Sequence, residues 1–555
     1  YPGQALDYQL SLDDDGDAWL FTEEDPRGVF YLDPDRGRFV HVHKDAPGAR
    51  LNTNIVRGVV QDNRGTIWIA TDHGGVNLLN KKDFSVTYLL HDPADPRSLS
   101  QNSVNALYKD DAGIVWLGTF RKGISYSHES LAKFPLYEHR DDDPAGLPFN
   151  DVNRFAEDAR GNLWIGTNGG GLVHYDRAAG RYRQFRHDPG NPNSLANDII
   201  VSLHVDRDGN LWIGTYFGGL DRFDGRTFTH YRHDPQNPNS LADDRVWEIF
   251  EDSRRNLWIG TLAGGLDRLD RQTGIFHHHR ANEPNSIHTN YVAALAEDRA
   301  GNLWVGTGYG LEVRDPRTGR FTHYLAGAEP GRLSNNNIFF VHEDSRGLVW
   351  IGTQEGLNLF DRSTKTFRVF RREEGLPDNS VLTILEDDRH HLWLSTPRGL
   401  SHLQIDGKRT DREDFSFRFV NYDRSDGLQG DEFNENAALR TRRGELVFGG
   451  GNGFNLFRPD SLGGDHDAGR VVLTGFQLFN RNVAVGETVN GRTLLPQAPG
   501  LTDEVVLKPG ENVFSVEFAA LNFLQPEKVR YSYLLEGFTN TWLAADEQAL
   551  RAPFT

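Results

Sequence analysis

The chain has 555 residues and a formal net charge of −19 at neutral pH, and it contains neither Cys nor Met. This length exceeds one ordinary domain, and the lack of cysteine excludes disulfides and thiol chemistry. The acidic charge without a basic run argues against binding to nucleic acid or to an anionic membrane surface, and no apolar stretch is long enough to span a bilayer.

The first predicted element is a turn followed by a strand around Trp19. The run Asp13 to Asp17 precedes this tryptophan. It could be mistaken for a calcium loop, but it lacks the downstream Glu and the ligand spacing of an EF-hand. Because later copies of the motif have a tight turn at the same place, we predict a turn here and no bound metal.

The same motif recurs along most of the chain at intervals of 43 to 49 residues. A tenth, degenerate copy has Phe448 at the tryptophan position. Self-similarity at such a period is typical of repeat folds. The aligned tryptophans are Trp19, Trp68, Trp116, Trp164, Trp212, Trp258, Trp304, Trp350 and Trp393.

One full repeat contains four short β-rich runs and no helical period. In the fifth copy these runs are residues 199–205, 211–215, 220–223 and 227–231, and each is closed by Gly, Asp, Asn or Pro. Four strands in about 45 residues is typical of a β-propeller blade. The sequence therefore predicts an all-β chain made of propellers.

Candidate ligand-binding residues lie in the loops between the second and third strands of the blades, because these loops converge on one rim of a propeller. Sugars bind to aromatic faces and planar hydrogen-bonding groups, and acidic sugars also need cations. On the upstream copies we select His73, Phe120, Arg121 and Lys122, and on the downstream copies Tyr216, Phe217, Tyr309 and Arg398.

Trp247 is a tryptophan outside the repeat register, near the start of a predicted innermost strand. It is either a stacking platform at the mouth of the channel or a large filler of the core. Both interpretations remain open from the sequence.

The regular pattern is lost between Ser127 and Pro148, which leaves three copies upstream and seven downstream. Seven is a usual blade number for a closed ring. We predict the last three blades of a first propeller at 1–140 and a complete seven-bladed propeller at 141–460. Three blades cannot close, so we expect the opening blades before Tyr1, and the absence of Met also suggests a fragment or a processed form.

The period stops after Pro459. Residues 471–479, 512–518 and 529–536 alternate apolar and polar side chains like strands. We predict a separate Ig-like β-sandwich at 461–555, truncated at its C-terminus.

Two histidine patterns suggest chemistry but have simpler explanations. His91, His187 and His233 each begin a repeated His-Asp-Pro, whose recurrence in register indicates turn chemistry. The run at 277–279 alternates across a strand and cannot present three ligands on one face. No carboxylate pair is distinctive enough for a glycosidase. We therefore expect no catalytic residues and no cofactor.

The repeat elements at 246–252, 256–261 and 265–270 resemble the two-component regulator propeller repeat. The tail, with Tyr531-Ser532-Tyr533, resembles the three-tyrosine β-sandwich that follows such propellers. The resemblance implies two seven-bladed propellers and a sandwich outside the cytoplasmic membrane, a transmembrane helix, and a histidine kinase that is often a hybrid. Glycan breakdown products are the usual signals of that family.

We therefore expect a periplasmic ligand-sensing domain of a sensor histidine kinase, with the kinase activity outside this chain. The expected partners are an oligosaccharide or another small extracellular ligand and a second copy in a homodimer, with membrane attachment only through a segment absent here. The alternatives are a propeller-type glycoside hydrolase or lyase, and a protein-interaction scaffold. The sandwich favours the sensor, because a hydrolase does not need one.

Overall fold

The computed structural model is all-β, as predicted. It divides into two compact units, Ala132–Gly463 and Tyr1–Leu131 with Gly464–Thr555. In the part of the chain that the structure describes, no helix is long and apolar enough to cross a membrane. The described residues are 7–23, 25–48, 50–93, 95, 97–129, 131, 133–141, 143–407, 415–462, 469–524, 526–538, 540–545 and 551–554.

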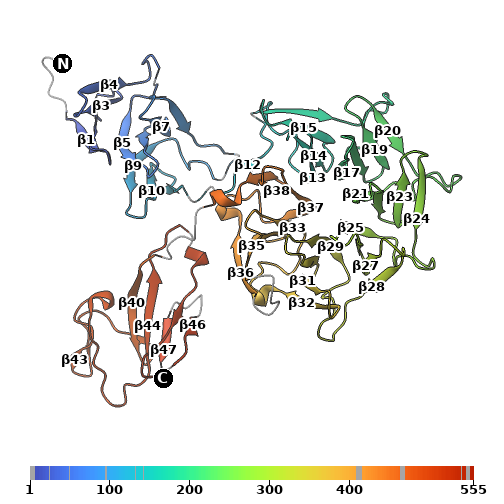
Figure 1. Ribbon diagram of the computed structural model, residues 1–555. Coiled ribbons are helices and arrows are strands. Elements are labelled where there is room, and N and C mark those ends of the chain that lie inside the picture. The colour runs from blue at the N-terminus through green and yellow to red at the C-terminus, as the bar shows by residue number, and fades with distance from the viewer. Residues whose placement is uncertain are drawn as a thin grey trace. The chain divides into compact units, whose positions relative to one another are not determined.

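The unit Ala132–Gly463 is a ring of seven four-stranded antiparallel sheets, counted over its described residues (Figure 1). We number these blades 1 to 7 in chain order. The strands of blades 1 to 6 are β13 (Val152–Glu157), β14 (Leu163–Thr167), β15 (Leu172–Asp176), β16 (Arg181–Phe185); β17 (Ile200–Val205), β18 (Leu211–Thr215), β19 (Leu220–Phe223), β20 (Phe228–Tyr231); β21 (Val246–Glu251), β22 (Leu257–Thr261), β23 (Leu266–Asp270), β24 (Ile275–His279); β25 (Val292–Glu297), β26 (Leu303–Thr307), β27 (Gly310–Arg314), β28 (Phe321–Tyr324); β29 (Ile338–Glu343), β30 (Val349–Thr353), β31 (Gly356–Asp361), β32 (Thr366–Phe370); β33 (Thr383–Glu386), β34 (Leu392–Thr396), β35 (Gly399–Asp406) and β36 (Ser416–Tyr422).

Blade 7 combines strands from both ends of this unit. It contains β37 (Phe433–Arg440), β38 (Leu446–Gly450) and β39 (Gly453–Phe457), and its outer strand is β12 (Leu136–Tyr137). Leu136 lies opposite Asn455, and Tyr137 lies opposite Phe454. The range predicted for the first propeller, 1–140, includes β12; the pairing corrects this, because these two residues complete the second ring.

The local sequence explains the first two strands of each blade. In blade 2, Asp206 Oδ1 accepts a hydrogen bond from the backbone N–H of Asn210 at 2.8 Å and closes the turn. Its Oδ2 accepts from Trp212 Nε1 at 2.8 Å, so the same carboxylate also orients the tryptophan. The four strands predicted for this repeat are confirmed to within one residue at each end.

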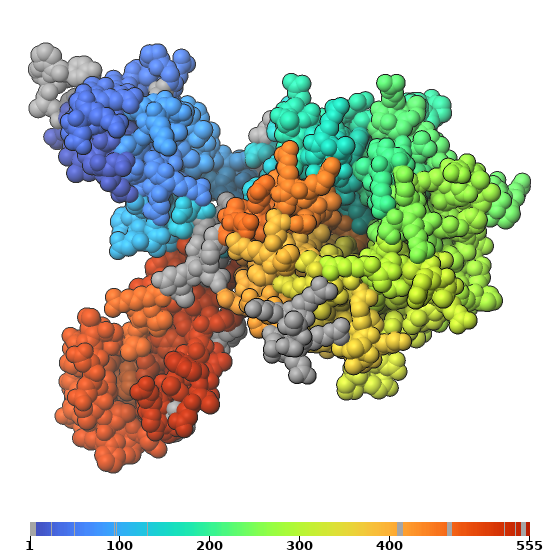
Figure 2. Space-filling model, in the orientation of Figure 1, coloured from blue at the N-terminus to red at the C-terminus, as the bar shows by residue number. Residues whose placement is uncertain are grey.

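The core of the ring lies between neighbouring blades. Trp212 of blade 2 packs with Val246 and Ile249 of blade 3 in one buried cluster, and Trp258 packs in the same way with residues of blade 4. Gly214 permits this contact, because a Cβ at that position would lie 2.8 Å from Val246 Cγ1. The space-filling view shows side chains filling the gaps between the ribbons (Figure 2).

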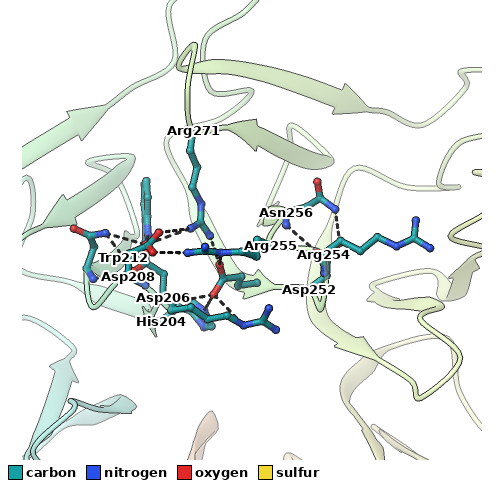
Figure 3. A network of polar contacts seen from close by, with 12 residues as sticks. His204, Asp206, Asp208, Trp212, Asp252, Arg254, Arg255, Asn256 and Arg271 are labelled. Atoms are coloured by element: carbon teal, nitrogen blue, oxygen red, sulfur yellow. Dashed lines mark hydrogen bonds and ion pairs between the residues drawn. The ribbon is translucent and has the colours of Figure 1, made fainter.

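Ion pairs join blades 2 and 3 near their turns (Figure 3). Arg271 donates from Nη2 to Glu251 Oε1 at 2.8 Å, and its Nη1 lies 3.5 Å from Asp206 Oδ2. Arg362 makes the equivalent contacts with Asp298 and Glu343 between blades 4 and 5. A basic residue after the third strand therefore links each of these blades to the carboxylate that orients its neighbour's tryptophan.

The second unit contains three upstream sheets and a tail. In the upstream part, counted over the described residues, two sheets have four strands and one has three. The strands are β1 (Gln9–Leu12), β2 (Ala18–Phe21), β3 (Val29–Asp33), β4 (Arg38–Val42); β5 (Val56–Gln61), β6 (Thr66–Thr71), β7 (Val76–Asn80), β8 (Val86–Leu89); β9 (Val104–Lys109), β10 (Val115–Thr119) and β11 (Ile124–Ser127).

The tail forms a four-stranded sheet in the order β41-β40-β44-β47 and two short pairs, β42 with β43 and β45 with β46. Two predicted tail strands match β40 and β44, whereas only Ser532–Tyr533 of the range 529–536 is paired. The tail strands are β40 (Val471–Leu478), β41 (Arg481–Asn482), β42 (Thr488–Val489), β43 (Arg492–Thr493), β44 (Phe514–Ala520), β45 (Ser532–Tyr533), β46 (Leu543–Ala544) and β47 (Arg551–Phe554). Single-turn 3-10 helices are η1 (Arg372–Glu374), η2 (Arg424–Asp426), η3 (Pro459–Ser461), η4 (Pro499–Leu501) and η5 (Pro526–Lys528).

Candidate functional site

Arg154 closes the centre of the seven-bladed ring. It belongs to β13, an innermost strand, and its guanidinium is almost fully buried. It donates to Val201 O of blade 2 at 2.9 Å and to Asn436 O of blade 7 at 3.0 Å. It also forms an ion pair with Glu248 of blade 3, with Nη2 2.5 Å from Oε2. One side chain thus ties four innermost strands together across the channel.

A bulge of β37 forms the other half of this closure. The pairing of β37 with β38 shifts between Phe433 and Ala438, so the residues between them leave the ladder. Asn436 adopts a left-handed backbone with φ of 58°, and its Nδ2 donates to Ala293 O of blade 4 at 3.3 Å. The bulge therefore projects from blade 7 into the ring.

Aromatic side chains from neighbouring blades gather at the mouth above this closure. Tyr216 follows β18 in blade 2, and its ring centroid lies 4.4 Å from that of Phe217 and 6.3 Å from that of Trp247. Phe217 is 60% exposed. Trp247 is half-buried, and its indole Nε1 has no acceptor among the described residues. The mouth thus presents aromatic faces and one unsatisfied donor.

Burial changes the titration of groups around the mouth. It raises the pKa of Glu248 even though Arg154 opposes the shift. It also raises the pKa of Glu435, in the bulge, again against the effect of Arg154. The pKa of Tyr291, just before β25, is raised by burial and further by the nearby Glu435 and Tyr216. Glu435 is partly buried, and both it and Tyr216 are close enough to act on the hydroxyl of Tyr291.

A polar cavity of about 850 Å³ opens on the same rim, between the loops of blades 6, 7 and 1. Asn434 links it to the closure, because its Nδ2 donates to Asp151 Oδ1 at 2.7 Å and its neighbour is Glu435. Arg398, a predicted site residue, lines the cavity, and its Nε lies 3.5 Å from Asp378 Oδ2. The other lining residues include Asp151, Asp423, Arg424, Asp431, Glu432 and Asn452.

The structure brings some predicted site residues together and leaves others apart. Tyr216, Phe217 and Trp247 form one cluster, which supports a surface role for Trp247 over a purely core one. Tyr309 is 56% exposed on the loop after β26, and Arg398 lies in the cavity described above. Whether any of them binds a ligand stays a prediction.

The four upstream candidates lie on neighbouring loops of the other unit. The backbone N–H groups of His73 and Phe120 both donate to Ser103, to its Oγ and its carbonyl respectively. His73 Nδ1 lies 2.9 Å from Asp72 Oδ1, and the Arg121 guanidinium lies over the Phe120 ring at 4.9 Å. Lys122 is exposed. Asp72 offsets part of the basic charge expected at this rim.

Two structural interpretations of conspicuous motifs are confirmed. His187 Nδ1 lies 2.7 Å from Leu195 O and closes the His-Asp-Pro turn, and His91 and His233 do the same. The acidic run around Asp13 is a turn, with Asp13 N–H donating to Asp17 O at 3.0 Å. Lys81 Nζ lies within 2.8 Å of Asp13, Asp15 and Asp17, where a cation would bind.

The closure and Tyr291 were missed by the sequence analysis, although a signal exists. Arg154 and Glu248 occupy equivalent positions of two innermost strands, each opposite a glycine of the next strand. Ser202 and Ala294 occupy this position in blades 2 and 4. Opposite charges in blades 1 and 3, at a position that is small in blades 2 and 4, indicate a contact across the ring. The repeat pattern does not predict the bulge of β37 or the position of Tyr291 at the mouth.

The two-component regulator propeller repeat matches the chain at eight places: residues 50–73, 98–121, 146–169, 194–217, 240–263, 286–309, 332–355 and 375–398. The chain is also 30% identical over 121 residues to a protein named Histidine kinase P4 from Formosa agariphila. This match covers 22% of the chain and only 9% of that kinase.

The chain is similar to solved structures of extracellular domains, and the first of these shares its fold. The extracellular domain of a putative hybrid two-component system from B. thetaiotaomicron superposes with a TM-score of 0.75 at 24% identity, covering 100% of this chain and 69% of that one. A second extracellular domain from the same organism, of a putative one-component system, has a TM-score of 0.49 at 22% identity, covering 100% and 71% of the two chains.

Proposed function

We propose that this chain, which carries two-component regulator propeller repeats, is the extracytoplasmic ligand-sensing part of a two-component signalling protein. Its ligand is an oligosaccharide bound at the mouth of the ring Ala132–Gly463. The observation that carries this proposal is an aromatic mouth above a closed channel. Arg154 and Glu248 form the floor, so a ligand stays on the rim, where Tyr216 and Trp247 offer ring faces.

The charges of the rim favour a neutral sugar. The cavity beside the mouth is lined by the carboxylates of Asp151, Asp423, Asp431 and Glu432 and by only two guanidinium groups, Arg398 and Arg424. Carboxylates accept hydrogen bonds from sugar hydroxyls but repel uronate and sulfate groups. We therefore expect uncharged oligosaccharides to bind better than acidic ones.

Signalling follows from a difference in affinity between two arrangements of the protein. A ligand shifts an equilibrium only by the free energy with which it prefers one state. In this proposal the tail β-sandwich passes the change to a kinase that lies outside this chain, in a homodimer held at the membrane by a segment that also lies outside it. The sandwich belongs to the three-tyrosine class in the same proposal.

A glycoside hydrolase is the second candidate. The observation in its favour is Glu435, a partly buried carboxyl group with a raised pKa beside the mouth, as a general acid requires. Glu248, the neighbouring carboxylate, is held by Arg154 and is poorly placed to serve as the second catalytic group. Release of reducing sugar, abolished by Glu435→Gln, would support hydrolysis over sensing.

Calorimetric titration of the chain with neutral and acidic oligosaccharide fragments tests the proposal. We expect a neutral fragment to bind, and Tyr216→Ala and Arg398→Ala each to weaken that binding about tenfold, with no sugar released. Arg389→Ala is the matched control, because it removes an equally exposed arginine from the turn between β33 and β34, at the opposite end of blade 6 from Arg398. Unchanged affinity in both rim variants would refute the site.

A further inference from the structure

Blades 2 and 3 each contain a histidine–aspartate pair that joins the third strand of the blade to its fourth strand. In blade 3, His278 Nδ1 lies 2.6 Å from Asp267 Oδ1, and its Nε2 lies 2.9 Å from Pro238 O. The other oxygen of Asp267 accepts from the backbone N–H of Ala242 at 2.8 Å. Both ring nitrogens of His278 face acceptors, an arrangement that favours a protonated imidazolium, which can donate twice.

Blade 4 departs from this pattern at two of the three positions. His288 replaces the alanine, Glu312 replaces the aspartate, and only the histidine of the last strand, His323, is kept. The backbone N–H of His288 donates to Glu312 Oε1 at 3.0 Å, as in the other blades. Its Nδ1 now also lies 3.2 Å from that oxygen, and His323 Nδ1 contacts Oε2. Two imidazoles thus converge on one carboxylate.

The packing of this cluster differs from that of the pair in blade 3. The ring centroids of His288 and His323 lie 3.7 Å apart, so the two imidazoles pack directly against each other over one carboxylate. Glu312 is 1% exposed, whereas the two histidines are 43% and 31% exposed. The cluster therefore combines a buried carboxylate, two imidazole rings and a path to solvent.

We propose that His288, Glu312 and His323 bind a divalent transition-metal ion of the zinc type. Their ligand atoms all lie within 4.8 Å of one another, and those of tetrahedral zinc are about 3.3 Å apart, since each lies about 2.0 to 2.2 Å from the ion. Two histidines and one carboxylate are an established zinc ligand set, with water in the fourth position. This site was not expected from the sequence.

The ion fixes one loop of the rim. His288 lies in the loop that leads into β25, while Glu312 lies on β27 and His323 on β28. Three residues after His288 comes Tyr291, which lies at the mouth of the ring. The metal thus anchors the segment that carries Tyr291 to the outer strands of the same blade, whether or not the mouth binds a sugar.

A second cluster among the described residues, Asp387, His391 and His402, does not have this character. Asp387 is the turn carboxylate of blade 6: its Oδ2 accepts from Trp393 Nε1 at 3.0 Å and its Oδ1 from the backbone N–H of His391 at 2.9 Å. Other blades of the ring make the same turn contact with Asn or Leu in the place of His391, so the contact does not require a histidine. We therefore expect one zinc ion per chain.

The test is zinc titration of the full chain after chelator treatment and dialysis, followed by calorimetry and melting temperature. We expect one site, a higher melting temperature with zinc, and the visible absorption of tetrahedral Co²⁺ when cobalt replaces zinc. His288→Ala should weaken binding at least about tenfold. This variant should fold, because alanine is the residue of blades 2 and 3 at that position.

Two controls separate the site from incidental binding. His277→Ala, which removes an exposed histidine of blade 3, and His391→Asn, which alters the second cluster, should both bind zinc like the parent. Introducing Ala242→His with Asp267→Glu, which rebuilds the cluster around His278, should raise the stoichiometry to two. Equal affinity in His288→Ala, or no binding by the parent chain, would overturn the proposal.

Discussion

The smallest unit of order in this protein is a carboxylate that serves a turn and a tryptophan at once. Asp252 accepts from two backbone N–H groups of its turn through Oδ1 and from Trp258 Nε1 through Oδ2 at 2.9 Å. The equivalent bond forms in every described tryptophan copy except that of Trp164. There Asp158 Oδ2 accepts from Asn162 and faces His174 instead.

This exception supplies two substitutions to compare, one at the buried Trp258 and one at the half-buried Trp164. Trp258→Phe removes a buried hydrogen bond to a charged group, which contributes about 1.5 to 3 kcal/mol, whereas Trp164→Phe removes no such bond. We therefore expect Trp258→Phe to lower the free energy of unfolding by about that much more than Trp164→Phe, measured by denaturant titration. Equal losses would show that the bond adds no net stability.

At the scale of the strand, the His278–Asp267 pair links β24, the outer strand of blade 3, to β23. The same pair also contacts the loop before β21. The hydrogen bond to Asp267 raises the pKa of His278, despite the opposing effect of burial. A raised pKa in the folded state means that the stabilisation is complete below the unfolded value of about 6.5 and is lost as pH rises through the folded value.

Melting temperatures measured from acidic to alkaline pH test this link. We expect the parent chain to lose stability relative to His278→Gln as the pH rises above neutrality, because only the parent carries the titrating imidazolium. His277→Gln, on the opposite face of the same strand, should follow the parent. A constant difference between parent and His278→Gln at all pH values would contradict the ion pair.

Strands were predictable from the sequence where a repeat supplied many copies of the same local code. The blade 2 strands follow from Asp206, Trp212 and the glycines that break the runs. β12 was not predictable, because Leu136 and Tyr137 carry no repeat signature and their partners lie at the far end of the ring. The third predicted tail strand, at 529–536, is mostly absent from the sheet pairing. Alternating apolar and polar side chains indicated a strand there, but such a pattern does not guarantee a pairing partner.

At the scale of the whole ring, Arg154 and Glu248 form one largely buried ion pair between the innermost strands of blades 1 and 3. Removing one partner of such a pair costs about 3 to 5 kcal/mol, because the other charge stays buried. We expect Arg154→Met to cost about this much and the double variant Arg154→Met with Glu248→Met to cost less. Denaturant titration of the two single variants and the double variant measures the coupling.

The stability of Arg154→Met at acidic pH provides an independent check. Without Arg154, only the backbone hydrogen bond from Ile249 opposes burial, so the pKa of Glu248 rises further and the neutral form is favoured in the fold. Stability from such a group is present at low pH and lost as pH rises through the folded pKa. Arg154→Met should therefore recover relative to the parent as the solution is acidified. A fixed deficit would mean that the loss is one of packing.

The candidate site was predictable only in part, for a physical reason. Tyr216 and Phe217 could be selected because the repeat leaves their loop free to vary. Glu435 and Asn436 reach the mouth through a bulge in the blade that has lost its tryptophan, and contacts across the ring connect residues hundreds of positions apart. The repeated motif predicts contacts between residues that are close in the sequence. It does not predict contacts between residues of different blades that face each other across the ring.

The pairing of β12 with β39 has a consequence for synthesis on the ribosome. Leu136 emerges early, but Asn455 follows roughly 320 residues later, and at about 5 to 20 residues per second that wait is roughly 16 to 64 seconds. During this time six blades can form while the outer edge of the seventh has no partner. The nascent ring remains open, with an apolar strand available to the wrong partner, until its last blade leaves the exit tunnel.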